Sequence, residues 1–292
     1  MYELIQARGA SHYIECPVKI GLVCLDDNEV VLIDSGSDKD AGRRVKKILD
    51  EHGWRLRAIY NTHSHADHIG GNRFLQDRSG CAIYAPGPEC AWANHVTFEP
   101  SFLYGGCPPR DLRHKFLMAQ ESQVQELTQE ALPEGFEWIP LPGHSMDMAG
   151  FRTPDGVVYL GDCVSSEETL AKYQINYLYD PAMFLETLER VKGMEAKLFI
   201  PSHAAPTEDI VPLAQRNIDK VHEIAGIIAD FCGESRTFEE ILQALFARFG
   251  LQMTFQQYAL IGSTTRSYLA WLRDRGELEV EIADARLLWR RA

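Results

Sequence analysis

Three histidines and one aspartate lie within six residues, from His63 to His68. Imidazole nitrogens and carboxylate oxygens are ligands that suit zinc and other borderline divalent cations. Because alternate side chains of an extended segment share one face, His63 and His65 can converge on a single ion. Asp67 and His68 then fall on the other side and could serve a second ion. The block therefore predicts a metal site with ligands for two ions.

Three further residues of the same types stand at the ends of short apolar runs. His144 follows one run through a Pro-Gly turn, Asp162 ends the next run, and His203 follows the last one. The His63–His68 block also follows a short run of β-type residues, and such runs ending in turns predict strands. A lone histidine after a strand is more often a capping or buried residue. Four such positions in one chain instead favour a shared site, because loops at strand ends carry functional groups.

With these motifs the chain resembles the metallo-β-lactamase superfamily of hydrolases, from its first strand to about His203. The most specific motif is the His-x-His-x-Asp-His block. The resemblance implies an α/β (α+β) fold, a four-layer αββα sandwich with two divalent ions. Zinc is the expected metal, with iron and manganese as alternatives. All seven ligand positions are filled: His63, His65 and His144 for one ion, Asp67, His68 and His203 for the other, and Asp162 bridging the two.

Asp34, in the run Val31–Gly36, matches a further motif of the same family. There it would orient a ligand from behind the metal site instead of binding metal. The alternative is an ordinary turn aspartate at the end of a strand, before Gly36.

The chemistry implied is metal-assisted hydrolysis, in which two ions about 3.5–4 Å apart share a hydroxide that attacks a carbonyl. Asp67 and Asp162 are the expected catalytic residues, Asp67 because it can also orient the nucleophile. No Gly-x-Ser-x-Gly motif suggests a serine nucleophile instead. The expected substrate is a thioester or related acyl ester, by analogy with hydroxyacylglutathione hydrolase. The C-terminal segment does not resemble that enzyme's glutathione-binding extension.

Three other functions stay open at this point. A phosphodiesterase or nuclease of the same fold is the second choice. A mononuclear iron persulfide oxygenase shares the first motif, but relatives of that type lose ligands of the second metal. A non-catalytic, metal-stabilised sensor would use the C-terminal segment instead.

Two segments are expected to cover the site. Residues 86–135 are rich in proline, glycine and aromatic residues and then turn helical, and a long insertion of this kind is usually functional. Residues 165–180 form a second loop, in which three tyrosines stand. Packing or surface solvation is the plainer interpretation for any one side chain. The candidate substrate contacts are Tyr104, Arg113, Lys115 and Tyr173.

The hydrophobic pattern predicts a catalytic domain over residues 1–232 and a small winged-helix-like domain over residues 233–292. Helices are expected at 38–52, 181–193 and 207–231. In the second domain a capping box at Thr237–Glu240 begins one helix. A short helix from Thr254 should end at Gly262-Ser263, a third should run from Thr264 to Arg275, and a hairpin should follow.

Charge and composition limit the kinds of partner that the protein is expected to have. The net charge is −13, and residues 233–292 carry eight basic and eight acidic side chains, which disfavours nucleic acid. No apolar run reaches the length of a membrane span. The seven cysteines, without a Cys-x-x-Cys pair, and a first segment without signal-peptide features favour a cytoplasmic protein. A small-molecule substrate is expected, and a homodimer stays open.

Overall fold

The computed structural model describes residues 2–25 and 28–292, and two sheets form its centre. The first sheet has seven strands in sequence order, antiparallel from β1 to β4 and parallel from β4 to β7. Its strands are β1 (Glu3–Arg8), β2 (Ser11–Glu15), β3 (Ile20–Cys24), β4 (Glu29–Ile33), β5 (Arg55–Tyr60), β6 (Ala82–Ala85) and β7 (Gln125–Glu126). The second sheet has the order β11-β10-β9-β8. Its strands are β8 (Glu137–Pro140), β9 (Ala149–Arg152), β10 (Val157–Ser165) and β11 (Leu198–His203).

Alternation along the strands divides the apolar side chains between the two faces of each sheet. In β4, Val31 and Ile33 face the second sheet and pack with Phe151 and Tyr159, whereas Val30 and Leu32 belong to the cluster on the outer face. Because successive side chains of a strand point to opposite faces, one apolar run can serve both layers. The predicted sandwich is therefore confirmed in its mixed α/β layers.

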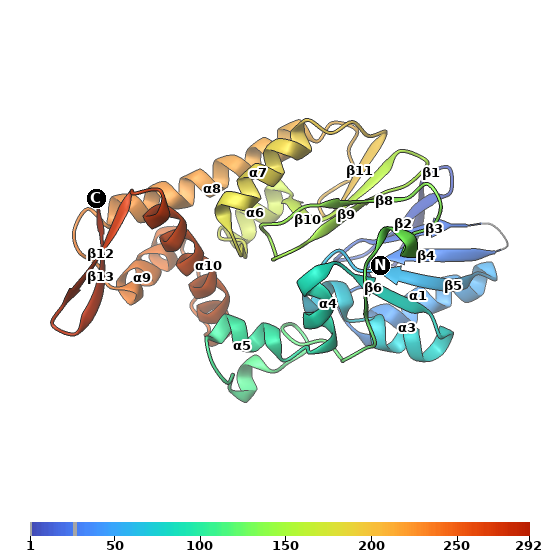
Figure 1. The fold of residues 1–292 in the computed structure, drawn as a ribbon, viewed down its shortest axis with the longest axis horizontal. Helices are drawn as coiled ribbons and strands as arrows, with labels where there is room; N and C mark the ends of the chain where they lie inside the picture. Colours follow the sequence, from blue (N-terminus) through green and yellow to red (C-terminus); the bar gives the residue numbers. More distant parts are fainter. Residues whose placement is uncertain (1, 26–27) are drawn as a thin grey trace.

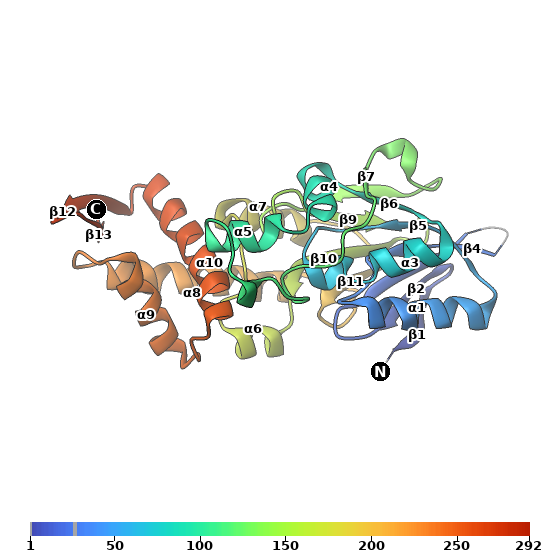
Figure 2. The ribbon, with the colours of Figure 1, turned by 90° about the horizontal axis from the view of Figure 1, so that it is seen from below.

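Helices cover both outer faces (Figures 1 and 2). On the first sheet lie α1 (Lys39–His52) and α3 (Asn72–Ser79), and on the second lie α7 (Pro181–Lys192) and α8 (Val211–Phe231). The predicted helices at 38–52 and 181–193 are confirmed to within a residue or two, and α8 begins four residues after the predicted start at Thr207. Asp38 caps α1 by accepting hydrogen bonds from the backbone N–H groups of Asp40 and Ala41, at 2.9 and 3.0 Å.

The insertion at 86–135 differs from the predicted order of irregular chain followed by helix. It begins with α4 (Gly87–Asn94) and α5 (Phe98–Tyr104), and most of the chain from Gly105 to Gly135 is irregular. The exceptions are the short 3₁₀ turns η1 (Arg110–Leu112) and η2 (Gln129–Ala131) and the strand β7. The segment 165–180 also contains a helix, α6 (Glu167–Tyr173).

The C-terminal residues form α9 (Phe238–Phe249), α10 (Phe255–Asp274) and the hairpin β12 (Leu278–Ala283) and β13 (Arg286–Arg291). The predicted capping box and hairpin are confirmed. The predicted break at Gly262-Ser263 is wrong, because α10 continues through it. A glycine inside a helix costs about 1 kcal/mol, and the buried Ile261, Tyr268 and Leu269 on the same helix offset that cost.

Contacts join this C-terminal segment to the sandwich (Figures 1 and 2). Leu242 and Leu269 belong to the same apolar cluster as Val158 and Ile218 of the second sheet and its helix. On the opposite side, α10 lies beside α5, where Ala259 packs with Leu103. Within the described residues, no helix is long and apolar enough to cross a membrane.

Candidate metal centre

The loop after β5 carries the His63–His68 block and is fixed from behind by Asp34. This carboxylate accepts hydrogen bonds from the Thr62 backbone N–H at 2.7 Å and from the Thr62 hydroxyl at 2.8 Å. The Nδ1 atom of His68 lies 2.8 Å from the same carboxylate. Since Nδ1–H donates to Asp34, the Nε2 atom of His68 is turned toward the site. Asp34 therefore orients a histidine, as the family motif predicted, and is not a simple turn residue.

Two glycines allow the loops to approach other backbone closely. A Cβ atom on Gly70 would lie 2.3 Å from the backbone of Ser37, at the end of the short helix α2 (Ala66–Ile69). Gly143 has a φ of 121°, and a Cβ atom there would lie 2.3 Å from the backbone nitrogen of Phe184 in α7. The second contact seats the turn before His144 against the first turn of α7.

Three of the predicted residues form the first group of nitrogen atoms. The Nε2 atom of His63 lies 3.0 Å from Nδ1 of His65, and that atom lies 3.1 Å from Nε2 of His144. Ligands of a tetrahedral zinc at 2.0–2.1 Å are separated by about 3.3 Å. The spacing of the three nitrogens therefore fits a common divalent cation.

The second group contains Asp67, His68, Asp162 and His203, whose potential ligand atoms lie within 4.8 Å of one another. The Asp162 carboxylate lies 3.0 Å from His68 Nε2 through one oxygen and 3.2 Å from His203 Nε2 through the other. That second oxygen is also 3.6 Å from His144 Nε2 of the first group. Asp162 thus lies between the two groups.

Two buried atoms of this group support a cation site directly. His68 Nε2 and Asp162 Oδ1 are both buried, and although they lie 3.0 Å apart their geometry is not that of a hydrogen bond. Buried polar atoms are normally hydrogen-bonded, so two ligand-type atoms that lie side by side without a hydrogen bond are what a bound cation would explain. The donor set of histidine and carboxylate fits zinc, iron or manganese.

Burial and charge give the groups different proton affinities. Burial holds the pKa of His63 well below its usual range and lowers the pKa of His144 to about 3. The attraction of Asp162 raises the pKa of His203 to about 10. Burial alone would raise the pKa of Asp162, but His203 and His68 hold it well below its usual range. Burial alone would lower the pKa of His68, but Asp162, Asp67 and Asp34 hold it well above its usual range. The first group is therefore ready to bind a cation, whereas His68 and His203 must each first lose a proton.

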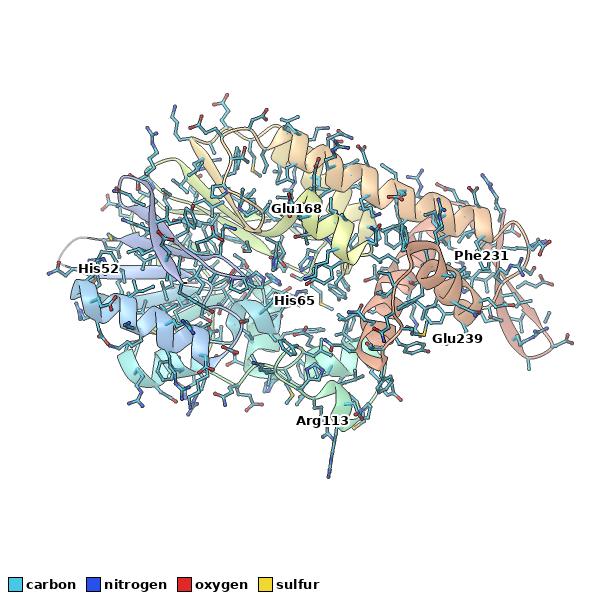
Figure 3. All side chains as sticks on the ribbon, turned by 180° about the vertical axis from the view of Figure 1, so that it is seen from behind. His52, His65, Arg113, Glu168, Phe231 and Glu239 are labelled. Carbon is cyan, nitrogen blue, oxygen red and sulfur yellow. The ribbon has the colours of Figure 1, made fainter. Side chains whose placement is uncertain are left out.

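The four predicted substrate contacts lie away from these two groups or have other partners. Figure 3 shows Arg113 pointing outward, on the far side of the insertion from His65. The Lys115 nitrogen pairs with Asp38 at 2.9 Å. Tyr104 packs edge-on against Phe255, with ring centroids 6.1 Å apart. Tyr173 is exposed, with the Lys172 nitrogen 4.7 Å from its ring.

Tyr177, a neighbour of the predicted Tyr173, contacts the site instead. Its ring centroid lies 5.1 Å from that of His65 and 5.8 Å from that of His144, in both cases edge-on. The adjacent Leu178 N–H donates to the Thr264 hydroxyl of α10 at 3.3 Å. The pattern of three tyrosines indicated the segment but could not decide which ring faces inward.

Glu89 of α4 is a second site residue that the sequence pattern did not indicate. Its side chain is buried and accepts hydrogen bonds from Ser64 and Asp147. A glutamate in a short helix is usually exposed to solvent, and neither its spacing nor its neighbours distinguish this one.

Comparisons with known proteins agree with this geometry. The sequence profile of the metallo-beta-lactamase superfamily matches residues 13–203. A probable metallo-hydrolase of Bacillus subtilis, YflN, is 26% identical over 222 residues, which are 65% of this chain and 83% of that protein. A hydroxyacylglutathione hydrolase of Maricaulis maris is 39% identical over 147 residues, and the match spans about half of each chain, 48%.

Solved structures show the same fold. A beta-lactamase domain protein from Burkholderia ambifaria has a TM-score of 0.75 at 19% identity, over 99% of this chain and 94% of that one. A metallo-beta-lactamase family protein from Thermus thermophilus has a TM-score of 0.71 at 20% identity, over 94% of both chains. Family, relatives and His/Asp clusters mark the chain as a metal-dependent hydrolase. It belongs to the metallo-beta-lactamase superfamily.

Proposed function

We propose that this enzyme uses two divalent cations to hydrolyse thioesters or related acyl esters of small molecules, and that zinc is the metal it uses. The observation that carries the proposal is the position of Asp162 between the two groups of ligand atoms. His63, His65 and His144 would hold one cation. Asp67, His68 and His203 would hold the other, and Asp162 would serve both.

Two cations bound there would lower the pKa of a water molecule toward about 7 and polarise a carbonyl oxygen. The Asp67 side chain is 41% exposed, whereas those of Asp162 and His203 are 11% and 24% exposed. This greater exposure supports the proposal that the Asp67 carboxylate accepts a hydrogen bond from the attacking water and orients it. Tyr177 borders the first group, and its edge-on ring against His65 excludes solvent from that side.

The surroundings favour an uncharged acyl group over a phosphodiester. Among the described residues, the side chains in ionic or aromatic contact with the ligand groups are histidine, aspartate and tyrosine, and none is lysine or arginine. Phosphate recognition generally uses arginine or lysine. Aromatic residues adjoin the site through Tyr179 instead, whose backbone N–H lies 3.2 Å from the His144 carbonyl oxygen. The ring centroid of Phe102 lies 6.0 Å from that of Tyr179 and 5.2 Å from that of Trp92.

We further propose that residues 1–232 form the catalytic unit and that residues 233–292 brace it. The second unit contacts the insertion through Ala259 and the loop before α7 through Thr264. A winged-helix-like module, here with the two helices α9 and α10 and a hairpin, would support the walls of the site instead of binding nucleic acid. All seven cysteines are free, which is consistent with a cytoplasmic enzyme.

A panel of substrates tests the proposed reaction. The zinc-loaded protein is assayed with an S-acyl thioester, an aryl acetate and bis(p-nitrophenyl) phosphate, and the Asp162→Asn variant serves as the blank. We expect cleavage of the two acyl compounds, with a phosphodiester rate at the level of the blank. Cleavage of the phosphodiester alone would contradict the proposal.

A further inference from the structure

Glu89 is a buried carboxylate on α4 that lies outside the two groups of ligand atoms. It is 3% exposed, and α4 follows β6, the strand that pairs with the edge strand β7 of the first sheet (Figure 1). A buried carboxylate is costly unless hydrogen bonds satisfy its oxygens. Its partners therefore indicate what the side chain does.

The two oxygens of Glu89 bind two different loops. Oε2 accepts hydrogen bonds from the backbone N–H of Ser64 at 2.9 Å and from the Ser64 hydroxyl at 2.5 Å. Oε1 accepts from the backbone N–H of Asp147 at 3.1 Å. Ser64 stands between His63 and His65, and Asp147 is three residues after His144.

These loops come from different sheets, since the first follows β5 and the second follows β8. The distance of 3.1 Å between His65 Nδ1 and His144 Nε2 crosses from one loop to the other and therefore depends on how the loops are held relative to each other. The start of α4 is fitted closely to the second loop. A Cβ atom on Gly87 would lie 2.3 Å from the Asp147 carboxylate.

We propose that Glu89 is a positioning residue that sets the spacing of His63, His65 and His144, and so the affinity of that half of the site for a divalent cation. The inference rests on the proposed metal-dependent function. The physical basis is that the Glu89 carboxylate accepts hydrogen bonds from both loops at once and so fixes the distance between them. Groups that orient metal ligands typically change metal affinity by about 10–100-fold when they are altered.

Zinc affinity, measured by competition with a chromophoric chelator, tests the proposal without an activity assay. In Glu89→Gln, one amide oxygen can accept from one loop, while the NH₂ group faces the N–H of the other. Glu89→Asp keeps the charge but is one methylene too short to reach both loops. We expect one of the two zinc dissociation constants, that of the His63, His65 and His144 group, to rise at least about 10-fold in both variants. Wild-type affinity in Glu89→Asp would show that charge alone matters and would overturn the positioning role.

Glu137→Gln is the matched control, because it removes an exposed carboxylate from β8, the strand that leads to His144. Its zinc affinity should equal that of the wild type. If Glu89→Gln does not fold, as judged by near-ultraviolet circular dichroism, Ser64→Ala decides, since it removes only the 2.5 Å hydroxyl bond. A several-fold loss of zinc affinity in Ser64→Ala supports the inference, and an affinity that is unchanged in both Ser64→Ala and Glu89→Asp refutes it. A wild-type protein that binds no zinc would instead refute the proposed function.

Discussion

The Nδ1 atom of His65 lies 3.1 Å from the Nε2 atom of His144, although the two residues are 79 positions apart. His65 follows β5 of the first sheet, and His144 follows β8 of the second. The packing of one sheet on the other therefore assembles this part of the site, and changes to the groups that hold the loops should weaken metal binding.

Asp162→Asn should abolish most activity while the fold survives. Asparagine has nearly the same shape, but it presents one neutral oxygen where Asp162 offers two charged ones to His68 and His203. We expect kcat/KM to fall at least about 100-fold, together with the loss of about one metal ion per chain. Steady-state kinetics and elemental analysis measure the two effects. Full turnover in this variant would be incompatible with the two-metal arrangement.

Asp34→Ala should weaken both stability and metal binding. The change leaves the buried Thr62 N–H and the Nδ1 of His68 without their acceptor, which costs about 1–3 kcal/mol for each unpaired group. Metal affinity should also drop about 10–100-fold, because His68 loses its orientation. Urea unfolding and chelator competition give the two quantities. Asp77→Ala is the control, since Asp77 is exposed and its ion pair is with Arg73 on the same helix. An equal effect in this variant would contradict the prediction.

The metal-free protein should lose stability between pH 6.5 and about pH 10. Asp162 raises the pKa of His203 from 6.5 to about 10 in the folded chain. The protonated ring therefore contributes stability that is fully present below pH 6.5 and is lost as the pH rises through about 10. Zinc affinity should increase over the same range, because the metal displaces that proton.

Urea unfolding of the metal-free protein from pH 6 to pH 9.5 measures this dependence. His203→Gln, which cannot be protonated, should show a smaller fall in the free energy of unfolding across the range. If the wild type and the variant have the same pH slope, His203 is not the group responsible.

The C-terminal segment should unfold together with the sandwich. Leu242 of α9 is fully buried in the cluster that contains Val158 of β10 and Ile218 of α8. Leu242→Ala should lower the free energy of unfolding by about 2–5 kcal/mol and leave one cooperative transition. Thermal unfolding followed by calorimetry and by near-ultraviolet circular dichroism tests this. Two separate transitions, with only the smaller one shifted by Leu242→Ala, would indicate an independent domain.

Local sequence patterns predicted the residues at strand ends, where the chemistry lies. The His63–His68 block could be identified because its ligand types are adjacent, and Asp162 and His203 because each ends an apolar run. The contact between His65 and His144 could not be derived from any periodicity, because it depends on how two sheets pack. The expectation that they share a cation came from the family resemblance.

The predictions that were wrong or missing share one cause, which is that they depend on tertiary packing and not on the local sequence. The glycine at 262 suggested a helix end, but burial of α10 against α5 and α8 outweighs that local preference. Strand β9 is only four residues long and carries no clear alternation, so it was not predicted. Glu89 was missed because its role depends on partners 25 and 58 residues away.

Metal content is the most direct test of the central claim. The protein is purified without added metal, analysed for its elements, and assayed in parallel for thioester cleavage. We predict two divalent ions per chain, with zinc as the expected metal. Thioester cleavage should be lost when a chelator removes the metal and restored when zinc is added. One iron per chain without thioester cleavage would contradict the account and would favour oxygen-dependent chemistry on the same fold.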